Sequence, residues 1–204
     1  SMAQPITCVA VGDAGVGKTC LLTMYTTDSF PGEKNPATMP THTGTVCLPG
    51  DATLTKLTTA EGLQIGPKTD VCLVCFSVIS RSSFDNVGEK WLKEIENFTP
   101  GTPFILVGTK TDLRDDDDTK GPSPVTKQEG EEMCRKLGGA KYLECSALLA
   151  SCAPSKSGII TEAQIAAKKF LPEVFNEAIR CARKKREEQK KEEDAAKSNP
   201  CTIL

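Results

Sequence analysis

The sequence predicts an α/β fold, a doubly wound and mostly parallel sheet of about six strands with helices on both faces. Two observations lead to this class. Short apolar runs such as residues 6–11 and 104–108 are typical of strands buried on both sides. Helical periodicity alternates with them, as in residues 82–98, where apolar side chains recur at spacings of three and four. In such sheets, ligands bind at the carboxyl ends of the strands.

The elements follow in order from these patterns and from the turn residues between them. Apolar or alternating runs predict strands at residues 6–11, 45–48, 53–57, 70–78, 104–108 and 141–145. Periodic segments predict helices at residues 20–25, 82–98, 126–137 and 162–186. Thr126 and Glu129 can form a capping box, Gly138 is a helix stop, and Pro172 is a possible interruption. Polar or proline-rich stretches predict loops at residues 28–43, 59–68 and 115–124.

The totals indicate one domain, expected at residues 1–180, followed by a charged flexible tail at 181–204. The net charge of −2 gives no general attraction to nucleic acid, so no such partner is expected. Neither a secretory leader nor a membrane-spanning run is expected. Five of the ten cysteines lie in apolar elements and predict buried, reduced thiols in the cytosol: Cys8, Cys72, Cys75, Cys134 and Cys145. Cys72 and Cys75 form a possible metal pair, but core packing is the favoured interpretation.

A glycine-rich segment between the first strand and first helix predicts phosphate binding. Residues 12–19 read GDAGVGKT, the phosphate-loop pattern of glycine, four residues, then Gly-Lys-Thr. The glycines let backbone N–H groups point at phosphate oxygens, and the following helix adds its positive end. Lys18 can reach the β- and γ-phosphates, and the Thr19 hydroxyl can ligate Mg²⁺. The remaining loop residues expected at the nucleotide are Asp13, Ala14, Gly15, Val16 and Gly17.

Two further motifs at strand ends predict that the base is guanine. Thr109-Lys110-Thr111-Asp112 places a carboxylate that can accept both N–H donors of the guanine edge, while the Lys110 stem lies along the base. Residues 144–148 read ECSAL, and the N–H of Ala147 can meet the guanine carbonyl oxygen. The motifs together add Leu113, Ser146 and Leu148 to the expected site.

With these motifs in order, the chain resembles the Ras superfamily of small GTPases, and within it the Rho/Rac family. The segments that carry the likeness are GDAGVGKTCLL, YTTDSFPGE, TDVCLVCFSV, FDNVGEKW, ILVGTKTDLRDD and KYLECSAL. The resemblance implies GTP or GDP with Mg²⁺, Phe30 against the base or ribose, and the backbone of Cys20 near the α-phosphate. It also implies a monomer that acts in signalling to the actin cytoskeleton. The partners would be effector proteins and Rho-type exchange factors, activating proteins and dissociation inhibitors.

The chain departs from the family where the family senses the γ-phosphate. Ala14 stands in place of a glycine, and its methyl group is expected to obstruct hydrolysis unless the exchange is neutral. Ala37 holds the place of a threonine that ligates Mg²⁺, so Thr38 substitutes only if the loop shifts by one residue. Thr19 alone is therefore expected to hold Mg²⁺ poorly.

The second switch segment departs as well. Where the family has Asp-Thr-Ala-Gly-Gln, residues 58–62 read TTAEG, so Thr58 takes the place of the metal-side aspartate. Glu61 takes the glycine's place, unless an insertion makes it Gly62. Two residues are candidates for a catalytic role, Lys18 and Gln64. Lys18 would offset phosphate charge, and Gln64 is the only candidate for positioning the attacking water.

Two questions stay open at the level of the sequence. The departures gather in residues 34–68 and 149–169, which fits either specialised switches or a misread exon or frame. The protein is either a switch with slow GTP turnover or a nucleotide-loaded scaffold that does not cycle and sequesters regulators. A phosphate-loop kinase or ATPase is disfavoured, because the Thr109–Asp112 motif reads guanine.

The closing residues CTIL fit a prenylation box on Cys201, and a terminal leucine favours geranylgeranyl. One lipid chain needs a second signal, often a basic patch. Here the basic residues between 180 and 186 lie well upstream and are followed by acidic ones. We therefore expect weak, reversible binding to the cytoplasmic face of a membrane, with a cytosolic pool.

Overall fold

The computed structural model describes residues 4–31, 41–51, 53–61, 65–114, 123–151 and 160–198. Within these residues one six-stranded sheet runs in the order β2-β3-β1-β4-β5-β6. The bounds are Ile6–Val11 (β1), His42–Cys47 (β2), Leu54–Glu61 (β3), Val71–Ser77 (β4), Phe104–Thr109 (β5) and Lys141–Glu144 (β6). The β2–β3 pair is antiparallel, and the other four pairs are parallel. The predicted sheet is confirmed.

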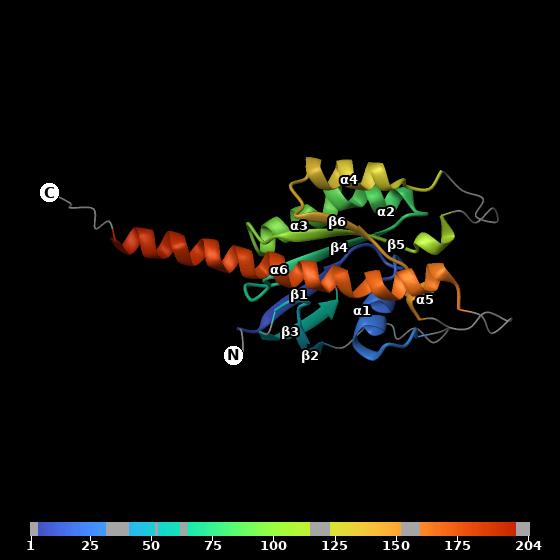
Figure 1. The fold of residues 1–204 in the computed structure, drawn as a ribbon. Helices are drawn as coiled ribbons and strands as arrows, with labels where there is room; N and C mark the ends of the chain where they lie inside the picture. Colours follow the sequence, from blue (N-terminus) through green and yellow to red (C-terminus); the bar gives the residue numbers. More distant parts are fainter. Residues whose placement is uncertain are drawn as a thin grey trace.

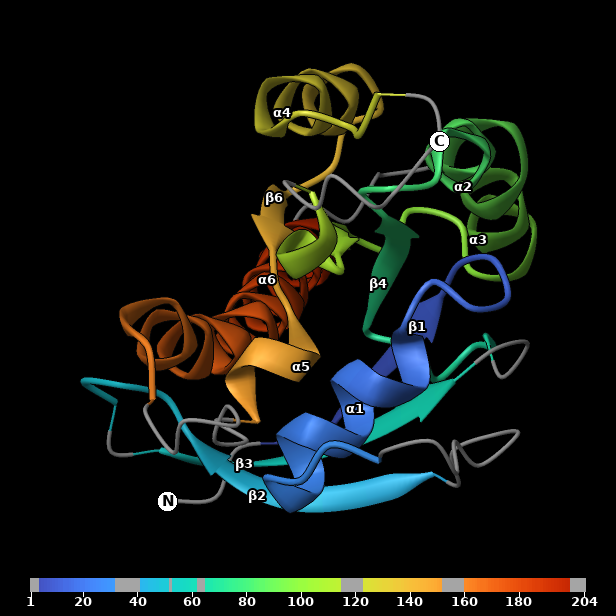
Figure 2. The same cartoon turned by 90° about the vertical axis from the view of Figure 1, so that its right-hand side faces the viewer.

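Helices cover both faces of this sheet (Figures 1 and 2). On one face lie α2, α3 and α4, and on the other lie α1, α5 and α6. The bounds are Lys18–Thr27 (α1), Arg81–Asn86 (α2), Leu92–Phe98 (α3), Lys127–Lys136 (α4), Ala147–Ala150 (α5) and Glu162–Ser198 (α6). A π-helical turn, η1 (Val87–Trp91), joins α2 to α3, and a 3-10 turn, η2 (Thr111–Leu113), follows β5. The doubly wound architecture is confirmed.

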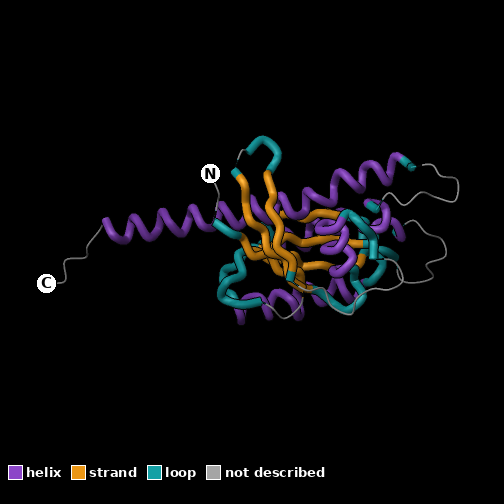
Figure 3. Tube along the Cα trace, turned by 90° about the horizontal axis from the view of Figure 1, so that it is seen from below, coloured by secondary structure: helices purple, strands orange, loops and turns teal. Residues whose placement is uncertain are grey.

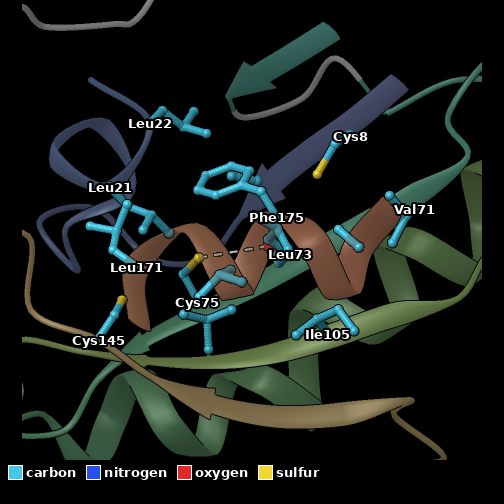
Figure 4. Packing of buried hydrophobic residues seen from close by; sticks show 14 of the residues in the cluster. Cys8, Leu21, Leu22, Val71, Leu73, Cys75, Ile105, Cys145, Leu171 and Phe175 are labelled. Atoms are coloured by element: carbon cyan, nitrogen blue, oxygen red, sulfur yellow. Dashed lines mark hydrogen bonds between the residues drawn. The ribbon is translucent and has the colours of Figure 1, made fainter. Parts of the chain in front are cut away.

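Strands β1, β4 and β5 bury apolar side chains on both sides, which explains their continuous apolar runs. On one side, Phe175 of α6 is fully buried among residues of β1, β4 and α1 (Figure 4). Its ring stacks on Tyr25 with centroids 3.6 Å apart. On the other side, the predicted stripe of residues 82–98 packs on β4 and β5, but Phe98 at its end is 57% exposed.

The largest differences from the predicted bounds are in β2, β3 and α6. Strand β3 continues to Glu61, and β2 begins at His42, both inside segments expected as loops. Polarity suggested loops there, but β2 and β3 pair with each other from His42↔Thr59 onwards, so the threonine-rich backbone is used in the sheet. Helix α6 runs past the predicted 186 to Ser198 with Pro172 inside it, and its C-terminal part extends beyond the sheet (Figure 3).

Most of the described cysteines are buried core residues. The five predicted to be buried are buried, and no disulfide joins the eight cysteines that the structure describes. Burial raises the pKa of Cys72 and of Cys75 to about 12, so both thiols are protonated at neutral pH. The pair therefore contributes packing. None of the described helices is long and apolar enough to cross a membrane.

Candidate functional site: a nucleotide pocket

A pocket of about 630 Å³ lies at the carboxyl ends of the strands, where doubly wound sheets bind ligands. Segments far apart in the sequence meet there: the phosphate loop, the ends of β3 and β5, η2 and the start of α5. Its lining comprises Ala14, Gly15, Gly17, Lys18, Thr19, Cys20, Leu21, Phe30, Glu61, Thr109, Lys110, Asp112, Leu113, Cys145, Ala147 and Leu148. Most residues predicted at the nucleotide are thus brought together in one cavity.

The phosphate loop is held close against β4. Gly12 has φ of +143°, and a Cβ at this position would lie 2.1 Å from the carbonyl oxygen of Cys75. Any side chain there would force the loop and the strand apart. Lys18 is 8% exposed, and its Nζ donates to the carbonyl oxygens of Gly12 (3.0 Å) and Asp13 (2.8 Å). The ammonium group is therefore fixed within the loop.

Two of the predicted loop residues turn their side chains away from the pocket. The Asp13 carboxylate accepts hydrogen bonds from Nδ2 of Asn86 (2.7 Å) and Nε1 of Trp91 (2.8 Å). These bonds fasten the loop to α2 and to η1. Val16 is buried in the core beneath the loop. Asp13 and Val16 thus hold the loop in place with their side chains and face the pocket at most through their backbone.

The base-reading segment is tied to the phosphate loop by Thr109. Its hydroxyl hydrogen-bonds the carbonyl oxygen of Val16 and lies 2.8 Å from that of Phe76. Lys110 follows in a left-handed conformation with φ of 58°. A methyl group at Gly17 would lie 3.9 Å from Cε of Lys110, so the lysine stem passes beside the loop. Both ends of the pocket are therefore held in one rigid unit.

The last predicted motif, residues 144–148, also contributes to the pocket lining. Ser146 is buried and caps α5 by accepting a hydrogen bond from the N–H of Leu149 (3.0 Å). Ala147 and Leu148, which follow it, line the pocket.

Glu144, at the end of β6, is paired with Arg114. Burial by itself raises the pKa of Glu144, but the guanidinium of Arg114 and the hydroxyl of Tyr142 outweigh burial and lower it. This ion pair, with N–O distances of 2.9 and 2.6 Å, joins the segment after β5 to β6.

The second switch segment differs from its prediction. Thr58 pairs in register with Thr7, three residues before the end of β3, and its Oγ1 lies 3.0 Å from Oγ1 of Thr43. The expectation that Thr58 stands at the metal-side position is therefore wrong. Glu61 ends the strand instead and lines the pocket, where its Oε2 accepts a hydrogen bond from Oγ1 of Thr19 (2.7 Å).

The donors at this end of the pocket fit Mg²⁺, which prefers oxygen ligands and is usually held by one or two protein groups together with phosphate oxygens. Thr19 offers a hydroxyl beside the Lys18 ammonium group. No group of three or more His, Cys, Asp or Glu side chains forms a metal cage among the residues placed in the structure. Thr38, Gln64 and Cys201 lie outside the described residues, so their predicted roles stay predictions.

The fold and the pocket together define a phosphate-loop nucleotide-binding protein. A family model of the Ras family matches residues 7–153, which is more than half of the chain. The chain belongs to the Ras family and is a small GTP-binding protein. The lining residues missed from the sequence were Leu21, Glu61 and Cys145. Only the pairing of β3 with β1 places Glu61 in the pocket, and the sequence alone does not reveal this pairing.

Proposed function

We propose that this small GTP-binding protein is a Rho-like switch in signalling to the actin cytoskeleton, with slow GTP hydrolysis. We infer guanine-nucleotide binding from one observation. Lys18 and Thr19, which suit phosphate and metal, line the same pocket as Lys110 and Asp112, which suit guanine. The Rho-like assignment rests on the segments FDNVGEKW and ILVGTKTDLRDD, which resemble that subfamily. Exchange factors, activating proteins and dissociation inhibitors of the Rho type are the partners that this assignment implies.

Each residue has a distinct role in this proposal. Lys18 offsets the negative charge of the β- and γ-phosphates, and Thr19 supplies a hydroxyl ligand to the metal. Asp112 accepts the N–H donors of guanine, while Lys110 and Phe30 flank the base. Thr19 would help to hold Mg²⁺, whose positive charge would offset the negative charge of the phosphates. The Thr109 hydrogen bonds keep the two ends of the nucleotide at a fixed separation.

Slow hydrolysis is inferred from Ala14. Ala14 belongs to the phosphate loop and lines the pocket. An attacking water, a positioning glutamine and an incoming arginine all need that space. An arginine finger accelerates preserved switches by about 10³- to 10⁵-fold, and we expect this protein to gain little.

Weak membrane association is inferred from α6. Its three arginines have acidic partners within the protein: Arg180 with Glu173 (2.8 Å), Arg183 with Asp51, and Arg186 with Asp70 (2.6 Å). Charges that are already paired attract an anionic leaflet less than free ones. A prenyl group on Cys201 would then be the main anchor, which supports reversible binding to the cytoplasmic face and a cytosolic pool.

A single-turnover experiment tests this function. The purified protein is loaded with GTP, and phosphate release is followed with and without a Rho-type activating protein, beside an Ala14→Gly variant. We expect slow release that the activator barely changes, and faster release in the variant. Rapid, activator-stimulated release from the unmodified protein would refute impaired hydrolysis. No release from either protein would favour the scaffold that does not cycle.

A further inference from the structure

The carboxylate of Glu61 lies in the nucleotide pocket, outside the sequence motifs that bind phosphate and base. It lies at the end of β3 and contacts both phosphate-loop side chains that act on phosphate and metal. Oε2 accepts the Thr19 hydrogen bond at 2.7 Å, and Oε1 lies 3.8 Å from Nζ of Lys18. The side chain of Glu61 is only 14% exposed. A partly buried carboxylate that contacts both of these residues is placed to act on the same ligand as they do.

Strand pairing explains why Glu61 reaches this place. Strands β1 and β3 are parallel, and Glu61 pairs with Ala10, two residues before Gly12 opens the phosphate loop. Parallel strands end at the same edge of a sheet, so the last residue of β3 lies beside the loop. Ala60 is buried, and successive side chains of a strand point to opposite faces. Glu61 therefore turns toward Thr19, whereas Thr58 lies further back along the strand.

We propose that Glu61 is the metal-side carboxylate of this protein and holds the Thr19 hydroxyl ready for Mg²⁺. A hydroxyl has one donor and two acceptor lone pairs, so Thr19 can donate to Glu61 and still offer oxygen to a metal. The negative charge of Glu61 also favours a divalent cation at that point. The inference rests on the proposed nucleotide site, and it replaces the expectation that Thr19 holds Mg²⁺ alone.

The contacts favour this role over competition with the phosphates for Lys18. Nζ of Lys18 makes its short bonds to the carbonyl oxygens of Gly12 and Asp13, at 3.0 and 2.8 Å. Its 3.8 Å separation from Glu61 is longer than a hydrogen bond. The nearest partner of Glu61 is Thr19, the metal-side residue. Glu61 is therefore a positioning residue for the cation.

Nucleotide retention measured against free Mg²⁺ tests this role. The Glu61→Gln variant keeps the size and the acceptor oxygen but loses the charge. Protein loaded with fluorescent GDP is chased with excess GDP over a series of free Mg²⁺ concentrations. We expect the Mg²⁺ concentration for half-maximal retention to rise about 10- to 100-fold in the variant. Glu131→Gln, an exposed change on α4 where Glu131 pairs with Lys127, is the matched control and should equal the unmodified protein.

A second readout uses Mn²⁺ as the probe. The electron paramagnetic resonance signal of free Mn²⁺ decreases when the GDP-loaded protein binds the cation, so it measures cation binding directly. Glu61→Gln should weaken Mn²⁺ binding by a factor similar to that expected for Mg²⁺. The Thr58→Asp change, added to Glu61→Gln, should not restore binding, because Thr58 pairs with Thr7 and faces Thr43. Restoration would overturn the assignment of the metal side to Glu61.

Other outcomes would overturn the inference in distinguishable ways. If Glu61→Gln has the same Mg²⁺ concentration for half-maximal retention and the same thermal unfolding as the unmodified protein, Glu61 does not position the cation. Tighter GDP binding in the variant without Mg²⁺ would make Glu61 a competitor of the phosphates. If the unmodified protein retains GDP equally well in a chelator, the metal role fails while the nucleotide site stands. If it retains no guanine nucleotide at any Mg²⁺ concentration, the proposed function fails as well.

Discussion

Replacing Asp13 with alanine should loosen the phosphate loop and destabilise the protein. The carboxylate accepts two hydrogen bonds, from Nε1 of Trp91 (2.8 Å) and Nδ2 of Asn86 (2.7 Å). Trp91 is 8% exposed, so its N–H would be left buried without this partner. A hydrogen bond to a charged group contributes about 1.5 to 3 kcal/mol. Because the two bonds share one carboxylate, we expect a loss of about 2 to 4 kcal/mol in the free energy of unfolding.

Urea denaturation followed by fluorescence measures this loss, because Trp91 is the only tryptophan in the chain. The Asp13→Ala midpoint should fall with little change in slope, and bound GDP should dissociate faster. Asp85→Ala, an exposed change on α2 next to Asn86, should alter the free energy of unfolding by less than about 0.5 kcal/mol. A loss for Asp13→Ala no greater than that of Asp85→Ala would refute the idea that this carboxylate anchors the loop.

Three further predictions concern the fold, the base and the anchor. Hydrogen bonding to Arg81 holds the pKa of Glu129 at about 2, below its ordinary 4.5. The contribution of this pair to folding stability is therefore full above pH 4.5 and is lost as the pH falls toward 2. Glu129→Gln should flatten the fall in urea midpoint between about pH 5 and pH 3. Asp112→Ala should weaken GDP binding at least about tenfold in calorimetry, with unchanged thermal unfolding, because two hydrogen bonds to a charged acceptor are lost; equal affinity would contradict guanine readout by Asp112. Cys201→Ser should leave the protein wholly soluble in fractionated cells, and a persistent membrane signal would contradict prenyl anchoring.

The parts of the fold that the sequence predicted well are those with strong local signals. The buried strand β1 has the predicted bounds of residues 6–11, because an apolar run that stops at a glycine leaves little freedom. The capping box of Thr126 and Glu129 is present at the start of α4. These features depend on neighbours in the chain, which the sequence displays.

The parts that were missed depend on pairing between distant residues. Threonine-rich residues of β2 and β3 suggested a loop, but their backbones pair with each other, and β3 pairs with β1 as well. Because of this pairing, Glu61 and not Thr58 lies beside Thr19, at the metal side of the pocket. The length of α6 was also underestimated. Its ion pairs with Asp51 and Asp70, made by residues inside the predicted bounds, were missed as well, because no local periodicity reveals them.

The orientation of side chains within a motif was likewise beyond the sequence. The phosphate-loop pattern placed Asp13 among the nucleotide residues, yet its carboxylate bonds Asn86 and Trp91, more than seventy residues away in the chain. Thr109 was expected at the base, and its hydroxyl instead links the base-reading segment to the carbonyl oxygen of Val16. The motif thus predicts the position of the backbone, while tertiary contacts decide what each side chain does.

Above all, this pocket is expected to bind guanine nucleotides in preference to adenine nucleotides. Calorimetric titration of the nucleotide-stripped protein with GDP and with ADP, in the same Mg²⁺ buffer, tests it most directly. Adenine lacks the pair of N–H donors that Asp112 would accept, and a site built for such donors discriminates by about 10⁴-fold. We therefore predict strong heat for GDP and none for ADP at equal concentration. Equal binding of the two nucleotides, or binding of ADP alone, would contradict the account.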